Sequence, residues 1–182
     1  LVKGASKGEG LGNQFLAHIR EVGVIAHVVR CFENEDIVHV SNRIDPADDI
    51  ETINMELAFA DLDTVNKRIE KAQRNARVMG KEDQKKAAAV LSALNKVKPL
   101  LENGQAARTA DLSDDEKAAL YDCHLITMKP MMYVCNVDEE GIQSGSPHVE
   151  AVRKIAQEQG SDVVVICGKF EADLAEMDSE DE

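Results

Sequence analysis

Residues 125–135 read Leu-Ile-Thr-Met-Lys-Pro-Met-Met-Tyr-Val-Cys, and Asn-Val-Asp-Glu follows directly at residues 136–139. The first part is a short, mainly apolar run, which predicts a buried strand. Residues 22–31 and residues 162–167 form two similar runs that are rich in Val and Ile. Continuous apolar runs of this kind are typical of parallel strands that are buried on both faces. The three runs therefore predict an α/β fold in which three strands lie parallel in one sheet.

A long segment between the first two predicted strands carries two apolar seams of helical spacing. Residues 48–78 hold the first seam and residues 87–101 the second, and apolar residues recur in both at steps of three and four. The seam residues are Met55, Ala58, Leu62, Val65, Ile69, Ala72 and Ala76, then Ala87, Val90, Leu94, Val97 and Leu101. A short polar break joins the seams, so we expect an inserted antiparallel coiled-coil hairpin. Pro99 is predicted to end or kink the second helix near Lys98.

Capping signals predict the shorter helices. Residues 113–116, Ser-Asp-Asp-Glu, form a capping box, in which the Ser hydroxyl and the Glu carboxylate each accept a backbone N–H. Ser146-Pro147 opens a helix that Gly160 ends. Helical spacing also indicates short helices at residues 13–21 and residues 170–177.

The carboxyl ends of the three strands are the expected location of a ligand site, because ligands of parallel sheets bind there. This rule brings together the loop after Arg30-Cys31, the segment Asn136–Glu139 and the pair Gly168-Lys169. The order Asn-x-x-acid at a strand end is similar to Asn-Lys-x-Asp, with which guanine-nucleotide proteins recognise the base. Here Val137 stands at the Lys position and Glu139 at the Asp position. Four residues alone are weak evidence, since such a pattern occurs often by chance.

The composition of the chain limits the kinds of partner that it is expected to bind. The chain has 182 residues and a net charge of −13, which argues against a broad nucleic-acid footprint, and we expect no direct DNA binding. Four cysteines without Cys-x-x-Cys spacing predict buried free thiols in a reducing compartment. No run reaches the roughly 18 apolar residues that a membrane span needs, and we expect no signal peptide. We therefore expect a cytoplasmic protein without a membrane partner.

The glycine-rich start, Leu-Val-Lys-Gly-Ala-Ser-Lys-Gly-Glu-Gly-Leu-Gly at residues 1–12, has two possible interpretations. It matches neither the dinucleotide fingerprint nor the phosphate loop, because Gly-Lys-Ser/Thr occurs nowhere in the chain. It is either a flexible connector or a switch loop that senses a terminal phosphate.

Several long stretches together carry a family resemblance. Residues 1–21, His-Val-Val-Arg-Cys-Phe-Glu-Asn at residues 27–34 and Asp-Ile-Val-His-Val at residues 36–40, with the inserted hairpin and residues 136–139, resemble the YchF-type, Obg-like ATPases. These are P-loop proteins of the translation-factor class, and the resemblance covers essentially the whole chain. It implies a Ras-like P-loop NTPase domain with a coiled-coil insertion, followed by a C-terminal TGS domain. It also implies an enzyme that hydrolyses ATP, and often GTP less well, as a switch near the ribosome.

The resemblance implies that this chain is an internal segment. The phosphate-binding loop and the Mg²⁺ ligands are expected before Leu1, and the TGS domain after Glu182, so no metal ligand is expected within the segment. The expected domains are residues 1–46 and 123–182 for nucleotide binding and residues 47–122 for the helical insertion.

The resemblance implies functional roles for the residues of this chain that stand at matching positions. Switch II would include Leu1, Gly4, Gly8, Gly10 and Gly12. Leu1 stands where Ras-like proteins have a water-orienting Gln, and His39 matches the family histidine proposed for that role, although a surface histidine is the plain alternative. The base-binding residues would be Asn136, Val137, Glu139, Cys167 and Gly168, with the Gly168 backbone N–H free to contact the base.

The altered motif predicts that the site binds adenine in preference to guanine. Glu139 is one methylene longer than Asp and would misplace the carboxylate that the two guanine N–H donors need, whereas Asn136 and backbone groups near Val137 could satisfy adenine. Glu139→Asp with Val137→Lys should therefore move the preference toward GTP. The isolated segment should bind ATP weakly or not at all.

A different class of function stays open. The chain could be a non-catalytic interaction module that acts through the hairpin. The expected tip of the hairpin is its most basic part, with Arg74, Arg77, Lys81, Lys85 and Lys86. That charge would suit ribosomal RNA, and a solvated helix face is the equally simple interpretation.

Overall fold

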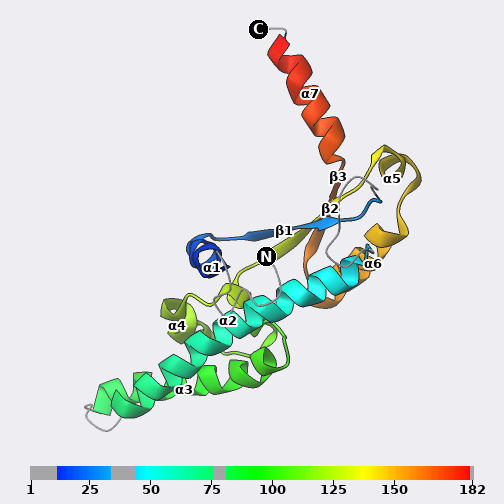
Figure 1. The fold of residues 1–182 in the computed structure, drawn as a ribbon. Helices are drawn as coiled ribbons and strands as arrows, with labels where there is room; N and C mark the ends of the chain where they lie inside the picture. The colour runs from blue at the N-terminus through cyan, green and yellow to red at the C-terminus, as the bar shows by residue number, and fades with distance from the viewer. Residues whose placement is uncertain (1–11, 34–43, 76–80, 181–182) are drawn as a thin grey trace. The chain divides into compact units, whose positions relative to one another are not determined.

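The computed structural model describes residues 12–33, 44–75 and 81–180, and its elements form an α/β fold in which helices predominate (Figure 1). The chain divides into two compact units. The sheet unit comprises the described residues of Val24–Glu51 and Pro130–Glu182, and the helical unit those of Leu1–Gly23 and Thr52–Lys129. Within the described residues, no helix combines the length and apolar character that a membrane crossing requires.

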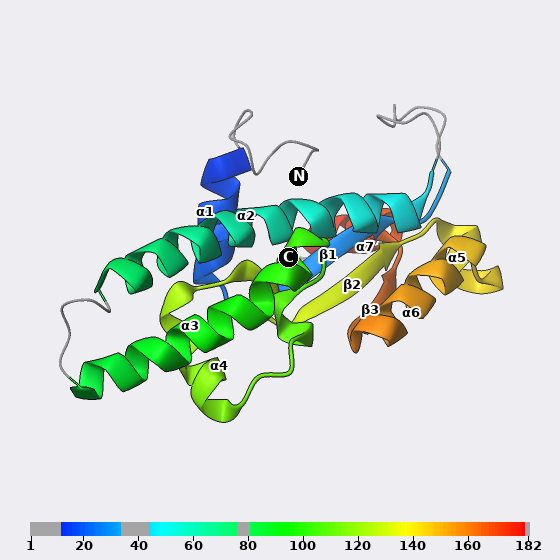
Figure 2. The same ribbon diagram turned by 90° about the horizontal axis from the view of Figure 1, so that it is seen from below.

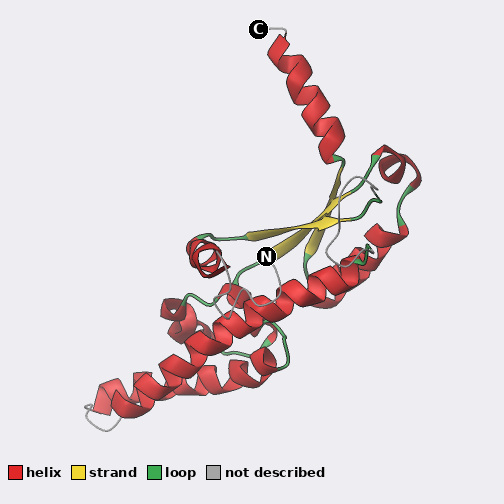
Figure 3. Ribbon diagram, viewed as in Figure 1, coloured by secondary structure: helices red, strands yellow, loops and turns green. Residues whose placement is uncertain are grey.

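Three parallel strands form the sheet, as predicted (Figure 3). They are β1 (Ile25–Arg30), β2 (Met131–Asn136) and β3 (Asp162–Ile166), in the spatial order β1-β2-β3. Arg30 pairs with Asn136, and Asn136 pairs with Ile166, so all three strands end in the same row. The residues that follow the strands therefore start from one edge of the sheet.

The two faces of the sheet differ in burial. Val29, Tyr133 and Cys135 are buried on one face, over which α6 (Pro147–Gln159) packs against β2 and β3. On the other face Val28 is 62% exposed, and Val164 in the same row is also exposed. The prediction that the strand at residues 22–31 is buried on both faces is therefore wrong for the described part of the chain. Apolar β-branched composition indicates a strand but does not show whether another element covers each face.

The second strand is shorter than predicted, because residues 125–130 do not belong to it. Ile126–Met128 form a 3₁₀ turn, η4, and the backbone N–H groups of Ile126 and Thr127 donate to the carboxylate of Asp61 at 2.9 and 2.7 Å. Pro130 has no N–H to offer to a ladder, and its carbonyl accepts from Ile25 at 3.0 Å. The strand consequently starts at Met131.

The helical unit contains α1 (Gly12–Glu21), most of α2 (Pro46–Asn75), α3 (Lys81–Glu102) and α4 (Asp114–Leu120). The antiparallel helices α2 and α3 lie side by side (Figure 2). Both predicted seams contribute to one apolar cluster, which also takes residues from the segment after α3. Its fully or largely buried members are Ala58, Val65, Ala93, Leu94, Val97, Leu101, Ala107, Leu112, Leu120, Cys123 and Leu125. The seams thus correspond to the buried sides of two helices.

Pro99 does not end α3 near Lys98, contrary to prediction, since the helix continues to Glu102. A proline in the last turn removes a single helical hydrogen bond. Leu101, the residue before the last one of the helix, is fully buried in the cluster, and Asn103 Nδ2 donates to the Pro99 carbonyl at 2.9 Å. Gly104 then takes φ +71°, a left-handed conformation that suits a helix end. Packing therefore outweighs the local cost of the proline.

The capping box forms as predicted and also ties α4 to α3. Ser113 Oγ accepts from Glu116 N at 3.2 Å, and Ser113 N donates to Glu116 Oε2 at 2.9 Å. The same carboxylate accepts from Lys96 Nζ and Ser92 Oγ, each at 2.8 Å. These contacts, led by the Lys96 ammonium, lower the pKa of Glu116 to about 2. Ser146, Pro147 and Gly160 likewise begin and end α6 as predicted.

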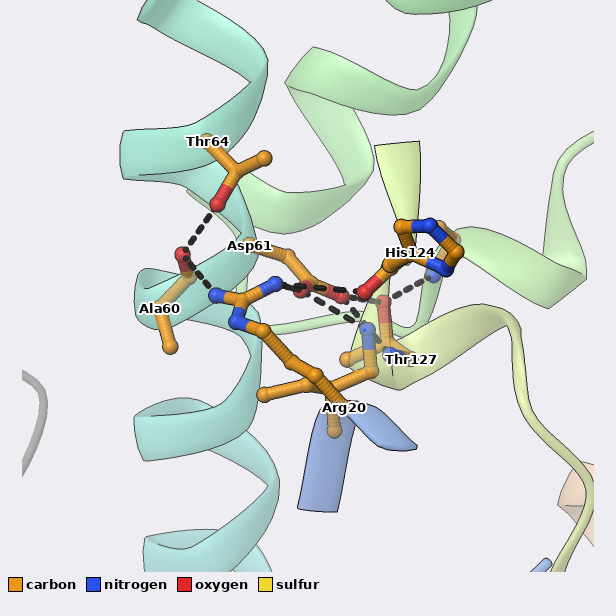
Figure 4. A network of polar contacts seen from close by, with 8 residues as sticks. Arg20, Ala60, Asp61, Thr64, His124 and Thr127 are labelled. Carbon is orange, nitrogen blue, oxygen red and sulfur yellow. Dashed lines mark hydrogen bonds and ion pairs between the residues drawn. The ribbon is translucent and has the colours of Figure 1, made fainter. Parts of the chain in front are cut away.

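Asp61 is the centre of a buried polar network in the helical unit (Figure 4). Besides the N–H groups of Ile126 and Thr127, it accepts from Thr127 Oγ1 at 2.7 Å and from Arg20 Nη1 at 3.4 Å. Arg20 also donates to the carbonyls of Ala60 at 3.1 Å and His124 at 3.2 Å. These contacts attach α1 to α2 within the helical unit.

Candidate functional site

A cleft of about 530 Å³ lies at the carboxyl ends of the strands in the sheet unit. We call it the base cleft. All three loops that were expected to meet at this edge contribute to it. Its lining residues are Phe32 and Glu33 after β1, Asn136, Val137, Asp138, Glu139 and Glu140 at the end of β2, and Cys167 and Lys169 after β3.

Asn136 connects two of these loops. It is the last residue of β2, and its Oδ1 accepts from the backbone N–H of Gly168 at 3.0 Å. A Cβ atom at Gly168 would lie 3.2 Å from that oxygen, so glycine permits this close approach. The expectation that the Gly168 N–H is free for a base is corrected, because Asn136 already accepts its hydrogen bond. Asn136 thus holds the start of α7 (Gly168–Glu180) against the end of β2.

Val137 lines the cleft with a side chain that is buried in the fold. Its side chain is 2% exposed, and its backbone N–H donates to the Ile166 carbonyl at 2.9 Å. That N–H is therefore not available to a nucleotide base, which removes one of the backbone groups expected near this position. A Cβ atom at Gly141 would lie 2.9 Å from Val137 Cβ, so the absence of a side chain at Gly141 lets the following helix approach.

Glu139 is the first residue of a helix, α5 (Glu139–Ser144), which the sequence did not lead us to expect. Asp138 caps this helix by accepting from Gly141 N at 2.8 Å. A capping Asp followed by two Glu in the first turn is the signal that could have revealed α5. Glu139 Oε1 lies 3.6 Å from Lys169 Nζ. The acid of the motif is thus paired with a cation from the next loop.

Phe32 and Glu33 were not among the predicted site residues, and Lys169 was named only as part of the sheet edge without a role. Each stands within three residues of a strand end, and this position was the available signal. The Arg30 guanidinium carbon lies 5.0 Å from the centroid of the Phe32 ring, and Arg30 Nε donates to the Phe32 carbonyl at 3.2 Å. The cleft therefore has one aromatic ring and one ammonium among four carboxylates.

The structure describes only some of the remaining predicted site residues. Leu1, Gly4, Gly8, Gly10 and His39 lie outside the described residues, and Gly12 is the first residue of α1. Cys167 is buried at the cleft, and all four cysteines are buried and free, as predicted. Within the described part of the chain, no group of three or more His, Cys, Asp or Glu could hold a metal ion, and we assign no metal ligand.

A parallel sheet with Asn-x-x-acid at the carboxyl end of a strand and a cleft built from neighbouring strand ends is typical of nucleotide-binding α/β proteins. No protein-family model matches the chain. The ribosome-binding ATPase YchF of Shigella flexneri is 53% identical over 181 residues, which cover 100% of this chain and 48% of the relative. The protein of the same name from Bacillus subtilis is 43% identical over 183 residues, covering 100% and 49%.

A solved structure of a protein with the same family name is also similar to this chain. The YchF GTPase of Schizosaccharomyces pombe superposes with a TM-score of 0.77 at 31% identity, covering 93% of this chain and 46% of the other. The chain spans about half the length of the curated relatives that it matches. The curated relatives named YchF are similar to this chain over its whole length, and this confirms the resemblance seen in the sequence.

Proposed function

We propose that the whole protein hydrolyses ATP in association with the ribosome, and that this chain supplies the part of the site that selects the base. The names of the relatives support the first half, since two are called ribosome-binding ATPases. The solved relative is called a GTPase, so the names do not agree on the nucleotide. The observation that carries the choice of base is the position of Glu139 in the base cleft, beside Lys169.

Guanine needs a carboxylate at a defined place, because its N1–H and N2–H donors point in the same direction. Glu139 extends one methylene beyond an Asp at the same position, and the Lys169 ammonium, 3.6 Å away, competes for its oxygens. Adenine has no such donor pair and offers N7 and N1 as acceptors. The Asn136 amide nitrogen can donate to one of them while its oxygen holds Gly168. A base whose donors and acceptors find no matching partner binds less tightly, so this arrangement favours adenine.

The charges of the base cleft suit a base better than phosphates. Glu33, Asp138, Glu139 and Glu140 bring four carboxylates, against the single ammonium of Lys169. Phosphate groups would be repelled here, whereas the Phe32 ring can stack on the flat face of a base. The phosphates and the Mg²⁺ ion that the family implies would then be held by other parts of the whole protein.

Calorimetric titration of ATP and GTP into the whole protein and its Glu139→Asp variant tests the base preference. Shortening the side chain should improve GTP binding relative to ATP by roughly tenfold, or about 1.4 kcal/mol. Glu140→Asp is the matched control, because it makes the same change at the neighbouring cleft residue. Val137→Lys is less suitable than the sequence implied, since the lysine would replace a buried side chain.

Equal ATP/GTP ratios in the Glu139→Asp and Glu140→Asp variants would contradict the base preference. The 182-residue chain serves as a reference and should bind ATP more weakly than micromolar, because affinity in this class of protein is dominated by contacts to the phosphates and the metal. A micromolar dissociation constant for this chain alone would show that the base cleft holds the nucleotide unaided.

A further inference from the structure

The Arg30 side chain connects the end of β1 to the loop that follows it. Arg30 is the last residue of β1 and pairs with Asn136, the last residue of β2, so both side chains lie on the same face of the sheet. This is the face on which Val28, two residues before Arg30, is exposed. Each of these strand ends contacts a neighbouring loop, because Asn136 accepts from the Gly168 N–H and Arg30 contacts Phe32.

Arg30 holds Phe32 by two contacts of different kinds. Its Nε donates to the Phe32 carbonyl at 3.2 Å, and this hydrogen bond restrains the backbone. Its guanidinium carbon lies over the Phe32 ring, 5.0 Å from the centroid, where a cation is attracted to the negative face of an aromatic ring. Because the guanidinium lies over one face of the ring, a ligand of the cleft can use only the opposite face or the edge.

Arg30 acts on the base cleft from behind this ring. Phe32 is the one aromatic residue among the described residues that line the cleft, whereas Arg30 does not line it. A ring that is already fixed in place loses less conformational freedom when a ligand binds, so the restraint favours binding. The guanidinium also brings a positive charge near a cleft that holds four carboxylates and one ammonium.

We propose that Arg30 is a positioning residue for the nucleotide base, which holds the Phe32 ring in the orientation that stacks on a base in the base cleft. This rests on the proposed function, since it takes the base cleft as the place where the base binds. It does not depend on which base is bound, because stacking accepts the flat face of any base. Arg30 therefore contributes equally to the binding of ATP and of GTP, whereas Glu139 distinguishes between them.

Calorimetric titration of the whole protein with ATP, GTP and ribose 5′-triphosphate tests the role of Arg30. Ribose 5′-triphosphate carries the same phosphates without a base, so its dissociation constant divided by that of a nucleotide measures what the base contributes. Arg30→Met removes the charge and the N–H donors from a side chain of similar shape. It should weaken the binding of ATP and of GTP by about two- to fivefold and leave that of ribose 5′-triphosphate unchanged. Arg30→Lys keeps the cation and should recover part of the loss.

Two further variants separate positioning from a general effect on the fold. Arg153→Met is the matched control, because Arg153 belongs to the same unit but lies outside the cleft, with Nε 3.6 Å from Glu150. Phe32→Leu removes the ring and should weaken the binding of both nucleotides by about five- to hundredfold. In the Phe32→Leu background Arg30→Met should have no further effect, because Arg30 acts through the ring.

Three results would overturn the proposal. The first is an unchanged contribution of the base in Arg30→Met with a native circular dichroism spectrum or, if that variant does not fold, in Phe32→Leu. The second is an equal loss of affinity for ribose 5′-triphosphate, because Arg30 would then serve the phosphates or the fold. The third is a loss in Arg30→Met that persists in the Phe32→Leu background. A failed adenine preference looks different, since Glu139→Asp would leave the ATP/GTP ratio unchanged while Arg30→Met still weakened the binding of both nucleotides.

Discussion

Asp61→Asn is the substitution for which the structure gives the clearest magnitude. The Asp61 carboxylate is fully buried and accepts from two backbone N–H groups, one hydroxyl and one guanidinium, of Ile126, Thr127 and Arg20. Two of these four donors face each oxygen. Whichever way an asparagine amide turns, its NH₂ group faces two of the groups that donate to the carboxylate, and of these only the Thr127 hydroxyl can turn to accept instead.

The expected loss of stability follows from those two hydrogen bonds. A hydrogen bond to a charged group contributes about 1.5–3 kcal/mol, so two of them are worth about 3–6 kcal/mol. Burial raises the pKa of Asp61, against the opposing effect of its hydrogen-bond donors, so removing the charge also removes an unfavourable desolvation. We therefore expect a net destabilisation of about 2–4 kcal/mol.

Two measurements check this prediction. Urea unfolding followed by circular dichroism gives the free energy of unfolding, and hydrogen exchange at the Thr127 amide reports on the network directly. Asp63→Asn is the matched control, two residues along α2, where the carboxylate is exposed and pairs with Lys67 at 2.6 Å. The control should change the stability by less than about 0.5 kcal/mol. The reasoning would be refuted if Asp61→Asn were no more destabilising than Asp63→Asn and left Thr127 exchange unchanged.

Two further substitutions test the packing of α4 and α5. The Glu116 pKa is lowered from 4.5 to about 2, chiefly by the hydrogen bond from Lys96, so its carboxylate stabilises the fold above about pH 4.5 and this contribution disappears as the pH falls toward 2. Glu116→Gln should flatten the fall of the urea midpoint across that range, and an unaltered pH profile would contradict the assignment. Gly141→Ala places a Cβ atom 2.9 Å from Val137 Cβ and should cost about 1–3 kcal/mol in thermal or urea unfolding. Gly23→Ala is the control, because no atom lies within 4 Å of its added Cβ, and it should not lower the stability by that amount. Equal effects of the two substitutions would show that the structure around Gly141 adjusts to the added methyl group without cost.

Features that depend on near neighbours in the chain were predictable. The Ser113–Glu116 capping box and the Ser146 cap join residues two or three positions apart, so local sequence specifies them. The two seams predicted α2 and α3 because helical periodicity places every third or fourth residue on one side. The place of the base cleft followed from a general property of parallel sheets, once the strands were recognised.

The errors occur where a distant residue competes with local preference. The strand predicted from residue 125 begins only at Met131, because Asp61, on another helix, takes the N–H groups of Ile126 and Thr127. Pro99 stays inside α3 because the buried Leu101 holds the last turn in the cluster. The Gly168 N–H was expected to be free, but Asn136, 32 residues earlier, accepts it.

The sequence by itself determined most of the elements, the parallel sheet, the family resemblance and the edge at which the candidate site lies, because periodicity, caps and strand ends are properties of short segments. Only the tertiary structure decided the contacts of polar groups whose partners lie far away in the chain. Glu139 meets Lys169 and Asn136 meets Gly168 because three loops converge at one edge, while Asp61 and Arg20 meet because α1 packs on α2. Such pairs join residues 30 to 66 positions apart, and no local pattern encodes which partner a folded chain brings within hydrogen-bonding distance.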